Sequence, residues 1–340
     1  MKRIVTLGEI MVRFSPPRPK TLKQSNQLDV YYGGAEANVA VALSNLENEA
    51  VFLTALPDNA IGDAVISFLK GEGVDTSAIV RDEKRVGTYL VEEGTAQRPT
   101  KVTYDRSYSS FSTLDSTQID WDAVFHHTDI LHTTGITLAL TDHTRELAYE
   151  AVEEAKKRDI LVSFDFNYRS KLWSYEQAKQ SILQILPYVD ICFGSELDLI
   201  NILERKSSGL SNINEQAPID LNLYQSFLQD YQIEWMVTSV RQPETNTHHS
   251  LFGTAVNQAG QQFLSPEYDF EIVDRVGGGD AFAAGFLDKF RKNESDVQDA
   301  INFAAGMGVL QHSVPGDAFV LTREDVEGFI KSQKGTGVIR

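Results

Sequence analysis

Short apolar runs alternate with longer stretches of helical period along most of the chain. The runs are rich in Val, Ile, Leu and Phe and have the length of buried strands; they are Ile4–Leu7, Val51–Leu56, Ile130–Thr133, Ile160–Asp165, Val189–Phe193 and Trp235–Ser239. Between them, Thr144–Arg158 and Tyr175–Leu186 have the spacing of amphipathic helices, with Asp142 and Ser174 as the expected caps. Strands separated by helices predict an α/β fold, with a mainly parallel sheet covered by helices on both faces.

Two regions break this alternation. Residues 10–33 and 86–106 carry short period-two patterns, such as that of Thr88–Val91, without a helix between them. We expect extra strands that project from the main body. They would form either a lid that excludes water from a reaction or a simple edge hairpin, and the pattern alone leaves both readings open.

Composition and charge narrow the class of protein. The chain has 340 residues, of which 42% are hydrophobic, enough for one large α/β domain or two smaller ones. The net charge of −17 opposes binding to nucleic acid or anionic lipid, so an anionic substrate needs local cations. The single cysteine, Cys192, excludes an intramolecular disulfide, and no apolar run reaches the roughly 18 residues of a membrane span. A cytoplasmic location is therefore expected.

The segment Val273–Phe286 carries the strongest chemical signal. Three glycines, Gly277, Gly278 and Gly279, lead directly into a helix, where exposed backbone N–H groups and the positive end of the helix dipole bind anions. Asp280 follows in the first turn, where the helix end favours its ionised form. Beside a bound phosphate it could deprotonate an attacking hydroxyl, although a helix-entry turn with an N-cap explains the same residues.

This segment resembles the C-terminal signature of the ribokinase-like (PfkB) carbohydrate kinases, Asp-Thr-x-Gly-Ala-Gly-Asp. The N-terminal signature of that family is matched by Gly33–Ala40, about 240 residues earlier. The resemblance implies one ribokinase-like domain over residues 1–340, a three-layer α/β/α fold with a small projecting β-sheet lid. It also implies that Asp280 is the catalytic base, that Gly277–Gly279 form the anion hole, and that Gly33, Gly34 and Asn38 bind the sugar.

Arginines near the predicted lid indicate the kind of sugar, because a carboxylate favours arginine forks. Tyr104 and Arg106 follow a lid strand, and Asp165-Phe-Asn-Tyr-Arg169 follows a central strand. These positions resemble those of 2-keto-3-deoxygluconate kinases. The resemblance implies that Arg106 and Arg169 hold the sugar acid, and the other residues implied at the sugar are Tyr89, Tyr104, Gly34 and Asp317. Fructokinases share the run that ends at Arg169, so only Arg106 and its tyrosines discriminate.

The nucleotide side departs from the family pattern. ATP and Mg²⁺ are the implied cofactors, with Asp198 at the metal and with nucleotide contacts expected from Asn167, Ser195, Thr238, Arg241, Gly277 and Gly279. Ser195 and Asp198 stand where the family has Asn and Glu, and Val240-Arg-Gln-Pro243 replaces a Gly-x-x-Gly turn. Arg275 either contacts a nucleotide phosphate or points to solvent. Whether a monovalent cation binds near Asp274, as in many relatives, stays open.

The leading hypothesis is ATP-dependent phosphorylation of 2-keto-3-deoxygluconate to its 6-phosphate. A fructokinase or another ketose or sugar-acid kinase of the same family is the first alternative. A catalytically weak sugar-binding sensor is the second, suggested by the departures at Ser195, Asp198 and Val240. The expected partners are small molecules, with no nucleic acid or membrane, and with a homo-oligomer formed through the lid strands.

Overall fold

The computed structural model describes residues 2–94, 97–207, 219–245, 247–290 and 296–333. Within these ranges the largest element is a ten-stranded sheet with the order β13-β12-β11-β10-β9-β8-β1-β4-β5, to which β14 is added beside β12. The bounds are β1 Arg3–Leu7, β4 Glu49–Pro57, β5 Ile79–Asp82, β8 Ile130–Thr134, β9 Leu161–Asp165, β10 Ile191–Phe193, β11 Trp235–Pro243, β12 His248–Asn257, β13 Gln262–Leu264 and β14 Tyr268–Glu271. Strands β11 to β5 run parallel, and β12, β13 and β14 pair antiparallel at one edge.

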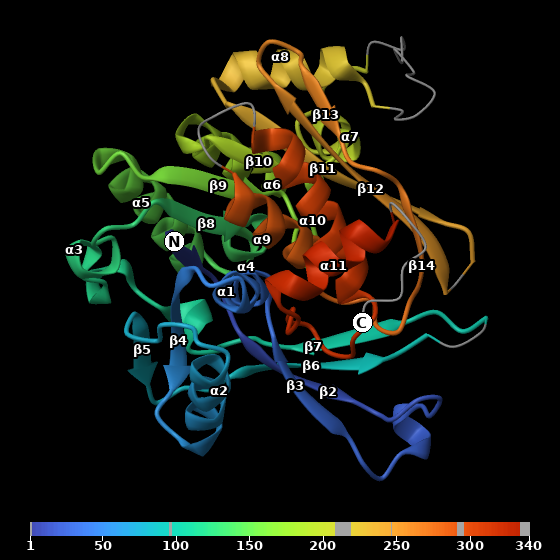
Figure 1. Cartoon of the computed structure of the whole chain (residues 1–340). Coiled ribbons are helices and arrows are strands. Elements are labelled where there is room, and N and C mark those ends of the chain that lie inside the picture. The colour runs from blue at the N-terminus through green and yellow to red at the C-terminus, as the bar shows by residue number, and fades with distance from the viewer. Residues whose placement is uncertain (1, 95–96, 208–218, 246, 291–295, 334–340) are drawn as a thin grey trace.

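Helices cover both faces of this sheet (Figure 1) because alternate strand residues point in opposite directions. Ile4 and Phe52 belong to one buried cluster, whereas their neighbours Val5 and Val51 belong to the other. The first cluster contains residues of α1 Ala35–Asn45, α2 Ala60–Gly71, α9 Gly278–Lys289, α10 Val297–Gln311 and α11 Arg323–Gln333. The second contains residues of α3 Trp121–Val124, α4 Gly135–Leu140, α5 Asp142–Lys157, α6 Tyr175–Ile185, α7 Glu196–Asn201 and α8 Leu221–Tyr231. The three-layer α/β/α prediction is confirmed.

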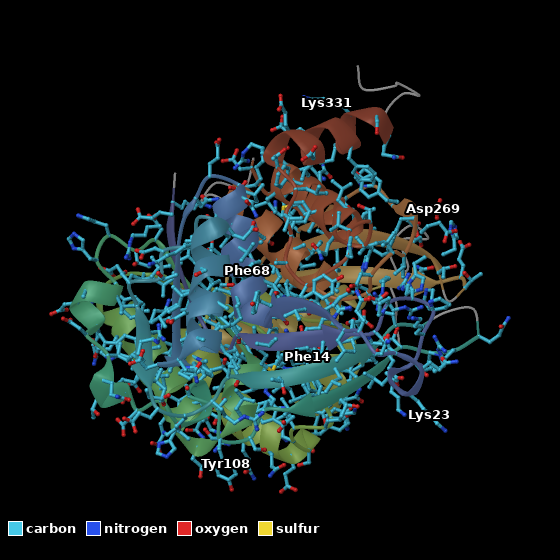
Figure 2. The ribbon with its side chains drawn as sticks, turned by 90° about the horizontal axis from the view of Figure 1, so that it is seen from below. Phe14, Lys23, Phe68, Tyr108, Asp269 and Lys331 are labelled. Atoms are coloured by element: carbon cyan, nitrogen blue, oxygen red, sulfur yellow. The ribbon has the colours of Figure 1, made fainter. Side chains whose placement is uncertain are left out.

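A second, four-stranded sheet has the order β3-β2-β6-β7 and projects from the main body. Its strands are β2 Met11–Ser15, β3 Asp29–Gly33, β6 Gly87–Glu92 and β7 Lys101–Asp105. We call these four strands the lid sheet. The view from below in Figure 2 shows Phe14 on the lid sheet and Phe68 of α2 to one side of it. The lid strands predicted within 10–33 and 86–106 are therefore present as one sheet rather than as an edge hairpin.

The predicted strands and helices of the main body are present with shifts of a few residues. Ser174 caps α6 as predicted, but the cap of α5 is Thr141 and not Asp142. The hydroxyl of Thr141 accepts from the Thr144 amide, which leaves Asp142 as the first helical residue. Among the described residues no helix has both the length and the apolar character that a membrane crossing needs. The single-domain assignment for residues 1–340 stays a prediction.

Candidate active site

A cavity of about 620 Å³ lies between the lid sheet and the carboxyl ends of the central strands. This edge is where open α/β sheets bind ligands. The cavity is lined by residues from both signatures, from the lid and from the segment after β9: Gly34, Asn38, Tyr89, Tyr104, Arg106, Asn167, Arg169, Arg241, Gly277, Gly278, Gly279, Asp280 and Asp317 all border it. The structure thus gathers most of the predicted site residues in one place.

Close approach requires glycine at two positions of the C-terminal signature, Gly277 and Gly278. Gly277 is the N-cap of α9 with φ +83°, a conformation that favours glycine, and an added Cβ there would overlap the carbonyl of Asp317. A Cβ on Gly278 would lie 2.5 Å from Nε2 of His312. Gly279 has open space, so the start of α9 presents backbone amides to the cavity without side chains over them.

Asp280 is the third residue of α9 and makes no capping hydrogen bond, so it is not the N-cap. Its Oδ2 accepts a hydrogen bond of 2.7 Å from Nδ2 of Asn38 on α1, which joins the two signatures. Burial raises the pKa of Asp280 to about 6, against the opposing effects of Asn38 and Arg169. The sequence suggested that the helix end would dominate and keep the carboxylate ionised, but burial is the larger effect. The carboxylate can still accept a proton above pH 6.

The double glycine of the N-terminal signature lets two segments pass closely. A Cβ on Gly34 would overlap the carbonyl of Glu9, and one on Gly33 would lie 2.6 Å from Cβ of Asp317. The amide of Gly34 donates to Oδ1 of Asn38 at 3.3 Å, which orients the Asn38 amide toward Asp280.

Arg106 is already paired inside the protein. Its Nε donates to Oε2 of Glu9 at 2.7 Å, its Nη2 contacts the same oxygen, and Ser109 donates to the other carboxylate oxygen. Glu9 is only 3% exposed and also borders the cavity. Tyr104 stacks on Tyr89 and lies 5.7 Å from the Arg106 guanidinium. The orientation of Arg106 is thus set before any substrate is bound.

The side chain of Asp317 is also held by hydrogen bonds. Its carboxylate accepts from the hydroxyl of Tyr89 and, at 2.9 Å, from Nη1 of Arg13. Burial raises the pKa of Asp317, although Arg13 and Tyr89 oppose this shift. Arg169, by contrast, is exposed at the cavity, where its Nη1 donates to the carbonyl of Tyr168. The arginine with the freer side chain is therefore Arg169.

Three carboxylates lie near the segment after β9. Burial, together with the charges of Asp280 and Asp198, raises the pKa of Asp165 to about 7. Asp198 accepts from both the amide and the hydroxyl of Ser195, and burial raises its pKa. Asp165, Asn167, Arg169, Ser195 and Asp198 line an adjoining cavity of about 350 Å³. Mutually repelling carboxylates in one pocket are a donor set that fits a hard divalent cation.

On the side where the sequence predicts the nucleotide, Arg241 and Arg275 border the main cavity beside the start of α9. Burial and the nearby charge of Arg275 lower the pKa of Arg241. Thr238 is 4% exposed and its hydroxyl donates to the carbonyl of Gly194, so its neighbour Ser239 lines the cavity instead. Asp274 bonds to the amides of Val276 and Gly316.

Two charged residues at or beside the cavity, Glu9 and Arg13, were not singled out from the sequence. Glu9 follows β1, so the position after a parallel strand was its signal. Arg13 lies at an inward position of a period-two strand, where an apolar side chain is usual. A charge at such a position is the signal that could have identified it.

A lid sheet over a cavity that ends at a glycine-lined helix start and at the Asp280 carboxylate is an arrangement suited to phosphoryl transfer. The model of the pfkB family carbohydrate kinases matches residues 1–237, and the chain belongs to this family. The 2-dehydro-3-deoxygalactonokinase of Haloferax volcanii is 32% identical over 96% of each chain. The structure of 2-dehydro-3-deoxygluconokinase from Thermotoga maritima is 34% identical, with a TM-score of 0.90 over 97% of this chain and 98% of that one. The 5-dehydro-2-deoxygluconokinase of Clostridium perfringens is 27% identical over 97% of this chain and 93% of its own.

Proposed function

We propose that this kinase transfers the γ-phosphoryl group of ATP to the terminal hydroxyl of 2-keto-3-deoxygluconate, giving the 6-phosphate. The observation that carries the proposal is the position of Asp280. It lies where a cavity lined by Arg106, Arg169 and two tyrosines meets the glycine-lined start of α9. A hydroxyl bound from the lid side and a phosphate bound at the helix would meet at this carboxylate.

Asp280 acts as the general base. Its carboxylate takes the proton of the sugar hydroxyl as the oxygen attacks the γ-phosphorus, and ADP leaves. The amides of Gly277–Gly279 donate to the phosphoryl oxygens, whose negative charge the helix end also stabilises. Asn38 holds Asp280 through its hydrogen bond at 2.7 Å. Gly33 and Gly34 allow the sugar to lie against the backbone.

Asp198 and Asp165 would hold Mg²⁺, with Ser195 orienting Asp198. The metal would neutralise phosphate charge during the transfer. Two solved kinases of this fold, one in complex with ATP and Mg²⁺ and one with bound ADP and a potassium ion, share 19% and 22% identity with this chain.

Arg241 and Arg275 would hold the nucleotide phosphates in place of the missing Gly-x-x-Gly turn. Their guanidinium groups border the cavity beside the start of α9 and are near enough that Arg275 lowers the pKa of Arg241. Anionic phosphates between them would remove this repulsion. Asn167 and Ser195 would contact the nucleotide from the adjoining cavity. Thr238 would not contact it, because its hydroxyl donates to the carbonyl of Gly194.

The sugar can be identified by assay. The three relatives above are named for three different keto-deoxy sugar acids. Coupled ADP release should be measured with 2-keto-3-deoxygluconate, its galacto epimer, 5-keto-2-deoxygluconate and fructose. We expect the highest kcat/KM with the gluco acid. Turnover of fructose without turnover of any keto acid would overturn the proposal.

One observation favours the fructokinase alternative. Glu9 neutralises Arg106, so the net charge available to a sugar carboxylate from the lid side is smaller than the sequence suggested. Arg169, Arg106 and Glu9 together still carry one net positive charge. For the sensor alternative, sugar-dependent melting without ADP release would be the supporting result.

A homo-oligomer through the lid sheet is also proposed. Phe14 pairs with Val30 on one side and Leu90 on the other, so these side chains form an apolar row on one face of the lid sheet. Val30 is 51% exposed. A second copy would cover this row. Analytical ultracentrifugation of Val30→Glu should then show dissociation relative to the wild type, and an unchanged mass would contradict this interface.

A further inference from the structure

Arg13 is the one arginine of the described residues whose side chain is fully buried; it lies in the middle of β2 on the cavity side of the lid sheet. A guanidinium group loses its hydration when it is buried, and this cost is recovered only through charged or hydrogen-bonding partners. Its neighbour on the same face, Met11, fills its position with an apolar side chain. The arginine therefore requires an explanation other than packing.

The partners of Arg13 come from four segments of the chain. Nη1 lies 2.9 Å from a carboxylate oxygen of Asp317 and 2.9 Å from one of Asp274. Nη2 lies 2.9 Å from Oε1 of Glu93, and Nε donates to the hydroxyl of Ser15 at 2.9 Å. Burial opposes the charge of Arg13, but Asp317 and Asp274 raise its pKa above the usual range. Arg13 therefore stays a cation inside this network.

The two carboxylates that share Nη1 belong to the two halves of the proposed reaction. Asp317 is held by Tyr89 on the sugar side, and its backbone carbonyl lies against Gly277. Asp274 accepts from the amides of Val276 and Gly316, so it shapes the turn that leads into Gly277. One nitrogen atom of the lid thus bridges the sugar side and the segment that leads to the anion hole.

Without this cation the two carboxylates would face each other as like charges in a buried site. Repulsion would separate the turn before Gly277 from the loop that carries Asp317. The amides of Gly277–Gly279 would then be displaced from the phosphoryl group, and a displacement of about 1 Å is enough to lower the rate by about 10²-fold.

We propose that Arg13 is a positioning residue that couples the sugar side of the cavity to the anion hole, through the Asp317–Nη1–Asp274 bridge. The inference rests on the proposed roles of Asp317 and of Gly277–Gly279. Sugar that orders the lid strand through Tyr89 and Asp317 also orders the turn before α9. Binding of sugar and of nucleotide is therefore mutually favourable, and the coupling passes through Arg13.

The test compares Arg13→Met with the matched control Arg18→Met. Arg18 pairs with the same Glu93 but is 39% exposed. Dissociation constants of a non-hydrolysable ATP analogue with Mg²⁺ are measured by calorimetry with and without 2-keto-3-deoxygluconate, together with kcat and both KM values. The ratio of the two constants is the coupling factor, expected between about 5 and 150 for the wild type.

Arg13→Met is expected to reduce the coupling factor to about 1 and kcat by about 10²-fold, with a smaller change in the KM for the sugar. Arg13→Lys should recover part of the coupling, since an ammonium group can reach one carboxylate but bridges poorly. Arg18→Met should keep the wild-type coupling factor. A folded Arg13→Met enzyme with wild-type coupling and kcat overturns the proposal.

The double variant Arg13→Met/Asp274→Asn removes the cation together with one of the two carboxylates. It is expected to fold even if the single variant does not, and still to lack coupling. If it shows wild-type coupling, Arg13 is a charge-compensating residue only and the proposal fails. Wild-type turnover of 2-keto-3-deoxygluconate is measured separately, so a wrong sugar assignment is recognised independently of the Arg13 result.

Discussion

The two ends of the active-site cavity differ in how their charges are satisfied. At the proposed sugar end, Arg106 is paired with Glu9, and Arg13 with Asp317 and Asp274. At the proposed nucleotide end, Arg241 and Arg275 border the cavity as neighbouring like charges. Charged groups paired with opposite charges are oriented before binding, whereas neighbouring like charges repel each other and an anion between them reduces this repulsion. Under the proposed function, opposite charges of the protein orient the arginines at the sugar end, and nucleotide phosphates would reduce the repulsion at the other end.

The largest expected effect lies where the two ends meet. Asp280→Asn removes the proposed base and keeps the size of the side chain, so kcat should fall by about 10²- to 10⁴-fold. Both dissociation constants should stay within a few-fold of the wild type, as measured by calorimetry with sugar and with Mg²⁺-ADP. Turnover close to that of the wild type would show that another group accepts the proton.

A smaller effect is expected from the sugar end. Arg106→Ala should raise the KM for the sugar acid by about 10- to 100-fold, because a hydrogen bond between two charged groups is lost. The same change should reduce the preference for sugar acids over fructose, measured as the ratio of kcat/KM values. The KM for ATP should not change.

A double variant separates binding from folding in this test. Arg106→Ala leaves Glu9 buried without its cation, which by itself destabilises a protein by about 3–5 kcal/mol. Glu9→Gln/Arg106→Ala removes that unpaired charge, so its stability should recover while the high KM remains. Recovery of both quantities would assign Arg106 to structure alone.

Substitutions at the proposed nucleotide end should change the KM for ATP and leave the KM for the sugar unchanged. Arg275→Ala and Arg241→Ala should each raise the KM for ATP by about 10-fold, the cost of one weakened phosphate contact. The KM for the sugar should stay unchanged, and the effect should shrink with rising salt. Arg205→Ala serves as the control, because Arg205 pairs with Asp230 and does not line the cavity. A change in sugar KM only would contradict the division of the cavity into two ends.

The sequence predicted the alternating main body and the lid strands, and its two signatures pointed to Gly34, Asn38 and Asp280 as site residues, although not to the hydrogen bond between Asn38 and Asp280. These depend on local periodicity and on contiguous motifs, which are visible in the chain. The pairing of Arg106 with Glu9 joins residues 97 positions apart, and period alone does not say which charges meet. The cap of α5 was misassigned because Thr141 and Asp142 are adjacent and both residue types cap helices well.

The electrostatic state of Asp280 was also beyond the sequence. The helix end and burial shift its pKa in opposite directions, and their balance depends on how closely the lid and α1 surround the carboxylate. The structure resolves this in favour of burial, with a pKa of about 6. Because a buried ionised carboxylate lowers the stability of the folded chain, the dependence of stability on pH tests whether Asp280 is held as a carboxylate inside the site.

The smallest expected effect is on stability. Because the pKa of Asp280 is higher in the folded chain than the ordinary 3.8, the folded state binds more protons between these two values, and stability falls as the pH rises through that window. Above pH 6 the ionised carboxylate costs about 3 kcal/mol, so Asp280→Asn should raise Tm by about 4 °C at pH 8 and by much less at pH 4. The matched control is Glu176→Gln. Glu176 is an exposed residue in the first turn of α6, where its negative charge interacts favourably with the helix dipole. Loss of that charge should lower Tm slightly at pH 8. If Asp280→Asn also lowered Tm at pH 8, the ionised Asp280 carboxylate would stabilise the folded chain through the start of α9, and its burial would not cost stability.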